Sequence, residues 1–172
     1  RRRHTRFRNV TGVQTCALPI CNGIKTKWVA NLLVAIHNIS TAEALLFAQR
    51  LGLDMASIVE VLADGAGSSR MLQVRGPMMV AHNWQPATMK VGIWKKDMTI
   101  IQSVLQSLDV PAPLFQASLP IYAAAMSLGM QADDTAAVYE VLERLTGKDL
   151  KKAGSRQARS ARPPAARRKA PR

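Results

Sequence analysis

The sequence predicts an all-α protein, with about six helices arranged around one long central helix. Apolar residues recur with the 3.6-residue helical period in the longer segments. Residues that favour helix ends stand between these segments, and no stretch shows a strong alternating strand pattern. The length of 172 residues suits one domain, and an apolar fraction of 48% is ample for a core.

The longest predicted helix covers residues 24–51. Its apolar residues follow the helical period at Ile24, Trp28, Leu32, Ile36, Ile39, Leu45, Leu46 and Leu51. Gly52 stands where a C-terminal cap belongs. Because the apolar face is wide, we expect this helix to be packed on several sides.

Two shorter helices and a loop are predicted next. A helix covers residues 54–63, with the aspartate at its first position as N-cap. Ser68 is placed to cap a short helix that ends at Leu72 or Val74. Residues 76–92 contain glycine, proline and asparagine and predict a loop of a length that is often functional.

Three further helices complete the prediction. The first covers residues 93–108 and is ended by the proline-containing turn that follows. The second covers 114–128, with Pro120 inside it as a kink or a split. The third covers 134–145, with an aspartate as N-cap and Gly147 after its end.

The formal charge of +13 is concentrated at the two ends of the chain. Residues 1–20 hold five arginines and residues 150–172 hold nine lysines or arginines, without an acidic residue in either segment. The segment 21–149 holds ten basic and eleven acidic residues, a net charge of −1. Since the basic tail lacks interleaved aromatic residues, we do not expect nucleic acid to be the partner.

The same partition predicts the domain organisation. Residues 1–20 show no helical or strand period and resemble translated sequencing-adapter sequence, so they are an artefact or a disordered leader. Residues 21–149 form the folded domain. Residues 150–172 are rich in alanine, arginine and proline and are expected to be disordered.

Cysteine usage and hydropathy suggest a cytoplasmic protein without metal. Cys16 and Cys21 have no further ligands placed near them for zinc, and two cysteines do not make a disulfide framework. The most apolar stretch, residues 28–36, is followed by His37 and Asn38 and is shorter than the roughly 20 residues that a bilayer helix needs. We therefore expect no membrane association.

Lys27 and Asn31 are the residues most suggestive of chemistry. They are four apart near the start of the long helix and so share one of its faces. Burying either side chain without a partner is unfavourable, and a partly buried lysine can donate or accept a proton. The alternative is that Lys27 simply reaches solvent where the helix begins.

Several short motifs occur in a consistent order. Residues 23–31 carry the pattern G-x-x-x-K-x-x-x-N, with its lysine at Lys27 and its asparagine at Asn31. The others are Thr41–Ala44, Gly52–Asp54, Gly65–Ser69, Trp94–Met98, Pro111–Leu114, Gly129 and Asp134–Ala137. Together they resemble the β-hydroxyacid dehydrogenases, a family that includes 3-hydroxyisobutyrate dehydrogenase, tartronate semialdehyde reductase and, more distantly, 6-phosphogluconate dehydrogenase.

The resemblance implies a function for four residues. Lys27 matches the catalytic lysine and Asn31 the substrate-binding asparagine of an NAD- or NADP-dependent oxidoreductase of small 3-hydroxy acids. Lys96 and Asp97 match a pair that faces the cofactor and substrate cleft, and we assign them to cofactor binding. An ordinary exposed helix pair is the alternative for Lys96 and Asp97. Met89 stands where an aromatic residue is usual, which leaves the shape of the substrate pocket open.

The resemblance also implies a domain arrangement. It covers about residues 21–147 and matches the helical C-terminal domain of the 6-phosphogluconate dehydrogenase type, through which such proteins form homo-oligomers. The motif G-x-G-x-x-G of a dinucleotide-binding domain is absent from the 172 residues. We therefore expect a dehydrogenase fragment without its Rossmann domain, inactive alone. The alternative is a non-catalytic helical oligomerisation or interaction module.

Overall fold

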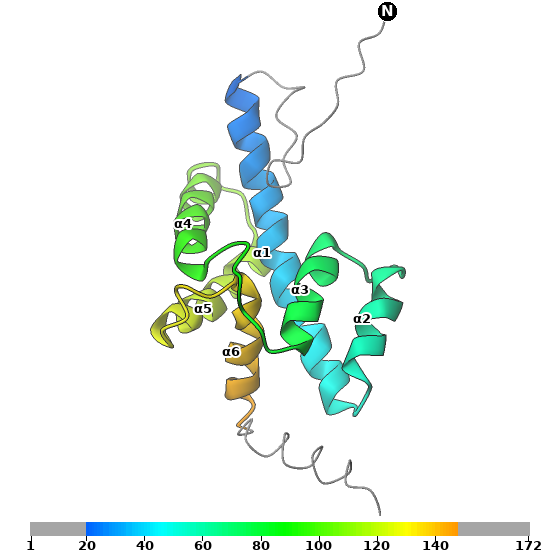
Figure 1. The fold of residues 1–172 in the computed structure, drawn as a ribbon. Coiled ribbons are helices and arrows are strands. Elements are labelled where there is room, and N and C mark those ends of the chain that lie inside the picture. The colour runs from blue at the N-terminus through cyan, green and yellow to red at the C-terminus, as the bar shows by residue number, and fades with distance from the viewer. Residues whose placement is uncertain (1–19, 148–172) are drawn as a thin grey trace, which may run out of the picture.

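The computed structural model describes residues 20–147, which form six α-helices and one short 3-10 helix (Figure 1). The elements are α1 Ile20–Arg50, α2 Met55–Ala63, α3 Arg70–Val80, α4 Val91–Ser107, α5 Pro113–Ser127, the 3-10 helix η2 Thr135–Ala137 and α6 Val138–Leu145. Within the described residues there is no strand, only an isolated antiparallel bridge between Lys90 and Asp134. The all-α prediction is therefore confirmed for this part of the chain. The predictions for residues 1–19 and for the basic tail lie outside the described residues.

Helix α1 is the centre of the fold, as predicted. Its 31 residues would extend over about 45 Å, and it contacts all five other α-helices. Figure 1 shows it running through the length of the molecule. Small or medium side chains on its packed face, Ala35, Asn38, Ala42 and Leu45, are fully buried. Short side chains at such positions allow the neighbouring helices to approach closely.

The opposite face of α1 is also apolar but exposed. Val29, Leu33, Phe47 and Leu51 leave between 47% and 66% of their surface accessible. With apolar residues on both faces, α1 is long and apolar enough to cross a bilayer by length and composition, which the sequence analysis had not expected. Its contacts with every other helix, and its buried Asn38, are typical of a core helix instead.

A polar contact inside the core joins α1 to α5 and η2. The Asn38 side-chain amide donates to the Tyr122 hydroxyl at 3.1 Å and to the Thr135 carbonyl at 2.9 Å. Burial of the Tyr122 hydroxyl raises the pKa of this tyrosine to about 12. Trp94 of α4 lies near the Tyr122 ring, with centroids 6.2 Å apart. Helices distant in sequence are thereby fixed around the middle of α1.

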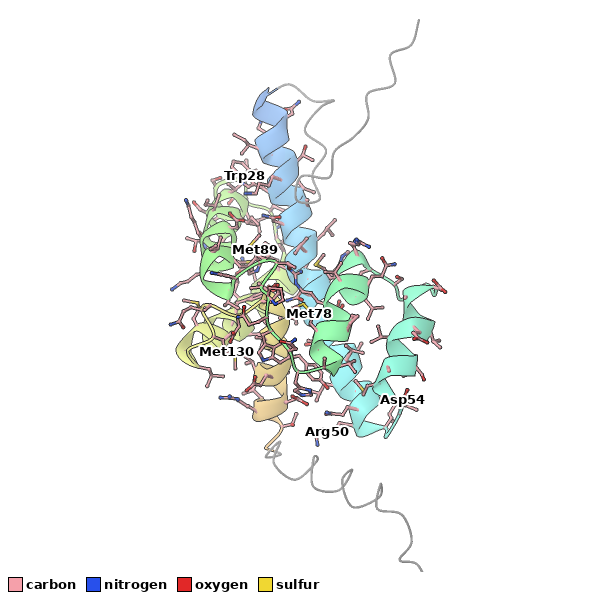
Figure 2. All side chains as sticks on the ribbon, in the orientation of Figure 1. Trp28, Arg50, Asp54, Met78, Met89 and Met130 are labelled. Atoms are coloured by element: carbon pink, nitrogen blue, oxygen red, sulfur yellow. The ribbon has the colours of Figure 1, made fainter. Side chains whose placement is uncertain are left out.

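The predicted helix ends are largely confirmed. Asp54 caps α2 by accepting from the Ser57 backbone N–H at 2.9 Å. Gly52 follows α1 with a φ of +76°, a conformation that glycine adopts without strain. The cap of α3 was predicted one residue early, because Ser69, not Ser68, accepts from the Leu72 N–H at 3.1 Å. Figure 2 shows Arg50 and Asp54 together at the end of α1 where α2 begins.

The predicted loop over residues 76–92 is wrong at both ends. Helix α3 continues through Gly76 and Pro77 to Val80, and α4 already begins at Val91, so the connection covers only residues 81–90. Gly76 is buried, and a β-carbon there would lie 3.4 Å from Val59 of α2. Packing against α2 therefore outweighs the low helix propensity of glycine and proline. Helix α5 is likewise a single helix that includes Pro120, so the predicted alternative of a split is wrong.

Asp134 fixes the connection between α3 and α4. This buried carboxylate accepts from the Thr88 hydroxyl and backbone N–H, both at 2.7 Å, and from the Met89 N–H at 3.0 Å. It also accepts from the Ala136 N–H at 2.9 Å and from Arg75 Nε at 3.0 Å. These contacts hold the segment that leads into α4, which carries part of the candidate site.

Candidate active site

Three of the four predicted site residues lie together. Asn31 Nδ2 of α1 donates to Asp97 Oδ2 of α4 at 3.1 Å. Lys27 Nζ, one turn before Asn31, lies 3.7 Å from the same oxygen. The Lys27 side chain is 54% exposed and that of Asp97 19% exposed. One carboxylate oxygen thus holds an ammonium and an amide side by side at a partly open surface.

The packing of the two helices produces this arrangement. On α1, Trp28 packs against the hydrophobic core and sets the rotation of the turn that carries Lys27. On α4, Trp94 and Met98 are buried, and Asp97 lies at the half-buried edge of this face. Figure 2 shows Trp28 on the part of α1 beside α4. The polar cluster of Lys27, Asn31 and Asp97 is therefore positioned by core contacts on both helices.

The two segments that form the cluster are strongly basic. Residues 20–31 hold Lys25 and Lys27, and residues 90–97 hold Lys90, Lys95 and Lys96. Asp97 is the single acidic residue in these two segments. The excess of positive charge in these two segments favours an anionic ligand.

Lys96 and Met89 lie outside the cluster. Lys96 precedes Asp97 on α4 and is exposed. Met89 is half-buried and packs against the core, while its backbone joins Asp134 and Thr135. The structure thus brings together Lys27, Asn31 and Asp97 but leaves Lys96 at the surface beside them. The resemblance assigned Asp97 to cofactor binding. In the structure its carboxylate contacts the side chains of Lys27 and Asn31.

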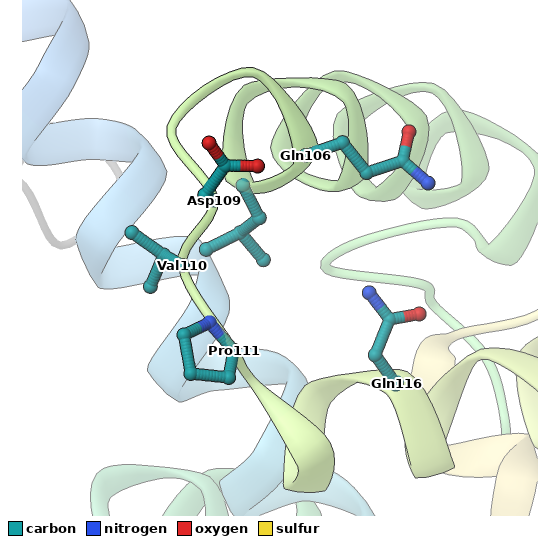
Figure 3. Close-up of a pocket in the computed structure, with 6 residues that line it drawn as sticks. Gln106, Asp109, Val110, Pro111 and Gln116 are labelled. Carbon is teal, nitrogen blue, oxygen red and sulfur yellow. The ribbon is translucent and has the colours of Figure 1, made fainter.

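A separate hollow of about 360 Å³ lies at the turn between α4 and α5 (Figure 3). Its lining consists of Leu105, Gln106, Asp109, Val110, Pro111 and Gln116. None of these residues belongs to the cluster around Asp97, and the lining is a mixture of amide and aliphatic groups with one exposed carboxylate. We therefore place the candidate site at the cluster and not in this hollow.

Two other ionic contacts were missed by the sequence analysis. Asp134 was predicted only as a helix cap, but it also pairs with Arg75, whose side chain is 6% exposed. His82 lies in the predicted loop over residues 76–92 and belongs to none of the motifs, but its Nε2 lies 2.9 Å from Glu143 Oε2. An arginine between the apolar residues of a short helix was the one available signal for the first contact, whereas nothing local in the sequence indicates the second. No cluster of metal-ligating side chains occurs among residues 20–147.

Comparison with known proteins gives a consistent family. Residues 21–142 match a family model described as the NAD-binding domain of NADP-dependent 3-hydroxyisobutyrate dehydrogenase. Glyoxylate/succinic semialdehyde reductase 2 of Arabidopsis thaliana is 31% identical over 122 residues, which is 71% of this chain and 34% of the plant protein. L-threonate dehydrogenase of Escherichia coli K12 is 27% identical over 124 residues, covering 72% of this chain and 41% of the relative.

A solved structure agrees with these relatives. The crystal structure of 3-hydroxyisobutyrate dehydrogenase from Salmonella typhimurium is similar with a TM-score of 0.66 and 27% sequence identity, over 69% of this chain and 41% of that protein. The chain therefore spans between about a third and two fifths of the length of these relatives. The similar part includes the residues of the cluster.

Proposed function

Because the chain belongs to the 3-hydroxyisobutyrate dehydrogenase family, we propose that its helices supply the proton-transfer and substrate-orienting side of a dehydrogenase active site. The reaction interconverts a small 3-hydroxy acid and its semialdehyde with NAD or NADP. We further infer that the six helices correspond to the helical C-terminal domain of the 6-phosphogluconate dehydrogenase type. Lys27, Asn31 and Asp97 carry the site.

The convergence of these three side chains from two helices is the observation that supports the proposal. Asp97 Oδ2 receives a hydrogen bond from Asn31 and an ionic contact from Lys27. An ammonium held at a partly open surface has protons to donate to a substrate oxygen. A carboxylate that contacts both neighbours restricts their rotamers and so prepares the geometry for reaction.

The chemistry follows from what each group can exchange. In the direction of reduction, the carbonyl carbon receives a hydride and the carbonyl oxygen must receive a proton. Lys27 Nζ donates that proton as a general acid and takes it back in the direction of oxidation. Asn31 holds the substrate oxygens by hydrogen bonding. Asp97 positions Lys27 and keeps it beside Asn31.

The cofactor, NAD or NADP, would supply or accept the hydride when bound. Residues 20–147 contain no strand followed by a glycine-rich turn, the arrangement that cradles a pyrophosphate. Lys96, which is exposed next to Asp97 on α4, fits the edge of an anionic cofactor. We therefore assign this part of the chain to the substrate side of the site, with Lys96 and Asp97 facing the cofactor.

We also propose a homo-oligomer through the exposed face of α1. On this face Val29 and Leu33 in the first half of α1, Phe47 near its end and Leu51 just after it are exposed apolar residues. Exposed apolar side chains opposite the packed face of a helix favour burial against another surface. A second copy of the chain is the partner that the family resemblance implies.

A chimera tests the proposed activity. Residues 21–147 are joined to the part of the Salmonella 3-hydroxyisobutyrate dehydrogenase that this chain does not cover. We expect the chimera to oxidise 3-hydroxyisobutyrate with NAD or NADP, and the 172-residue chain alone to show no turnover. Asn31→Ala in the chimera should raise KM about 10- to 100-fold, because a hydrogen bond to a charged substrate is lost.

A folded chimera without turnover would contradict the proposed function and would favour the non-catalytic interaction module. Circular dichroism and thermal unfolding establish whether the chimera is folded. Asn22→Ala is the matched control, since Asn22 is an exposed asparagine of α1 outside the cluster. KM for the control should remain that of the unmodified chimera.

Light scattering after size exclusion tests the oligomer. We expect a dimer or larger assembly that Phe47→Glu converts to a monomer, because a buried charge at an apolar interface is unfavourable. Val61→Glu on α2 is the matched control, since Val61 is similarly exposed but lies on another helix. A monomeric wild-type chain at all concentrations would contradict this part of the proposal.

A further inference from the structure

His82 joins the connection after α3 to helix α6. It follows the end of α3 with a φ of +48°, which turns the chain away from the helix axis. Its Nε2 lies 2.9 Å from Glu143 Oε2, and the histidine side chain is 39% exposed while that of Glu143 is 3% exposed. A solvent-accessible imidazole thus reaches a carboxylate that is sealed inside the fold.

The other partners of the buried carboxylate are neutral groups, the Tyr139 hydroxyl among them. Glu143 Oε1 accepts a hydrogen bond from the neutral Gln49 amide of α1 at 2.9 Å. The nearby arginines are engaged elsewhere: Arg50 donates to the Thr146 hydroxyl and Arg144 pairs with Glu140. Among the described contacts, His82 is therefore the one side chain that can place a positive charge on Glu143.

The groups around His82 favour its charged form. On α6, Glu143 and Glu140 are the facing carboxylates, and the Tyr139 ring lies 5.5 Å from the imidazole, centroid to centroid. Trp84, 6.0 Å from the imidazole, donates its indole N–H to Glu140 at 3.0 Å. On α1, the charge of Arg50 acts on Tyr139. Two carboxylates and two aromatic rings thus surround one titratable imidazole.

We propose that the His82–Glu143 pair is a pH-sensitive latch that fastens the first half of the connection 81–90 to α6. With His82 protonated, the buried charge of Glu143 is compensated and the connection is held. With His82 neutral, the hydrogen bond joins a neutral donor to a carboxylate, so the interaction between the connection and α6 weakens. The second half of the connection remains fixed by Asp134 through Thr88 and Met89.

The direction of the switch follows from the pKa of His82. The hydrogen bond to Glu143 raises this pKa above 6.5, burial of the ring opposes the rise, and the charges of Glu143 and Glu140 add to it. A group whose pKa is higher in the folded state stabilises the fold fully below its unfolded pKa. That stabilisation is lost as the pH rises through the folded value, so the latch opens on the alkaline side.

Thermal unfolding at several pH values tests the latch in the full chain. We expect the melting temperature of wild type, relative to that of Glu143→Gln, to fall by about 2–6 °C between pH 6 and pH 9. Glu143→Gln keeps the shape and the Gln49 contact but removes the charge. His37→Gln is the matched control, because His37 lies on α1 outside this group, and it should preserve the wild-type pH dependence. Parallel pH profiles of wild type and Glu143→Gln would overturn the proposal.

Proton NMR of the histidine rings gives a second measurement that does not need the variant to be stable. His82, assigned by comparison with His82→Gln, should titrate above pH 6.5 in the wild-type chain. In Glu143→Gln its midpoint should move down towards the ordinary value. A wild-type midpoint at or below 6.5 would overturn the latch whatever the variants do. The result does not depend on the chemistry proposed for Lys27.

Discussion

Two aspartates of this fold each meet a cation, and their surroundings differ in every respect. Asp134 is fully buried, receives five hydrogen bonds from Arg75, Thr88, Met89 and Ala136, and pairs with an arginine that is 6% exposed. Asp97 is partly open, and its described contacts are Asn31 and a lysine that is 54% exposed. Both aspartates join segments that are distant in sequence, yet only one of them has its acceptor sites filled.

This difference distinguishes an aspartate that stabilises the fold from one that belongs to the candidate site. A buried carboxylate with several donors is held in a single arrangement, because losing any donor leaves a charge without compensation. A partly exposed carboxylate with an ammonium at 3.7 Å leaves protons free to meet a ligand. We therefore assign Asp134 to the fold and Asp97 to the site.

Asp134→Asn should give the largest loss of stability. Arg75 would stay buried without a counter-charge, so we expect the free energy of unfolding to fall by about 3–5 kcal/mol in urea titrations. Asp133→Asn is the matched control, since Asp133 is the half-buried neighbour and bonds Gln85. It should change the free energy by less than about 1 kcal/mol. Equal effects of the two substitutions would remove the distinction between the two aspartates.

The dependence of the melting temperature on pH in the acid range also distinguishes Asp134 from Asp97. Burial acts to raise the pKa of Asp134, but the donors from Ala136, Thr88 and Met89 and the charge of Arg75 outweigh it and lower the pKa below 3.8. The resulting stabilisation is present above pH 3.8 and is lost as the pH falls through the folded value. Asp134→Asn should therefore flatten the loss of melting temperature in this acid range, and an unchanged slope would contradict the assignment.

Asp97→Asn should change stability little and activity more. Lys27 is 54% exposed, so solvent screens its contact with the half-buried Asp97, and the free energy of unfolding should stay within about 1 kcal/mol of the wild type. In the chimera we expect kcat to fall about 10- to 100-fold, because Lys27 loses the charge that positions it. A large loss of stability, or full activity, would show that Asp97 does not position the lysine.

The sequence was most informative where the signal is local. The period of α1, the Asp54 cap and the glycine after α1 all depend on neighbouring residues, and they were predicted. The extent of α3 was not, because Gly76 stays helical through its contact with Val59 of another helix. Contacts between distant segments have no local pattern that a single sequence displays.

In the candidate site, too, the contacts between distant segments could not be predicted from the sequence. The spacing of Lys27 and Asn31 placed them on one face of a helix, and a motif resemblance indicated Lys96 and Asp97 as a pair. Spacing alone did not reveal that Asp97 touches both residues of α1 while Lys96 does not. The difference arises from the rotation of α4, which is set by the burial of Trp94 and Met98.

Turnover by the chimera with Lys27→Met tests whether Lys27 transfers the proton. The substitution keeps the approximate length and the apolar stem of the side chain but removes the ammonium group that donates the proton. We expect kcat to fall by about 10²- to 10⁴-fold, while Lys25→Met, at an exposed lysine on the same helix, should leave kcat nearly unchanged. Equal kcat values for the two variants would contradict the assignment of proton transfer to Lys27.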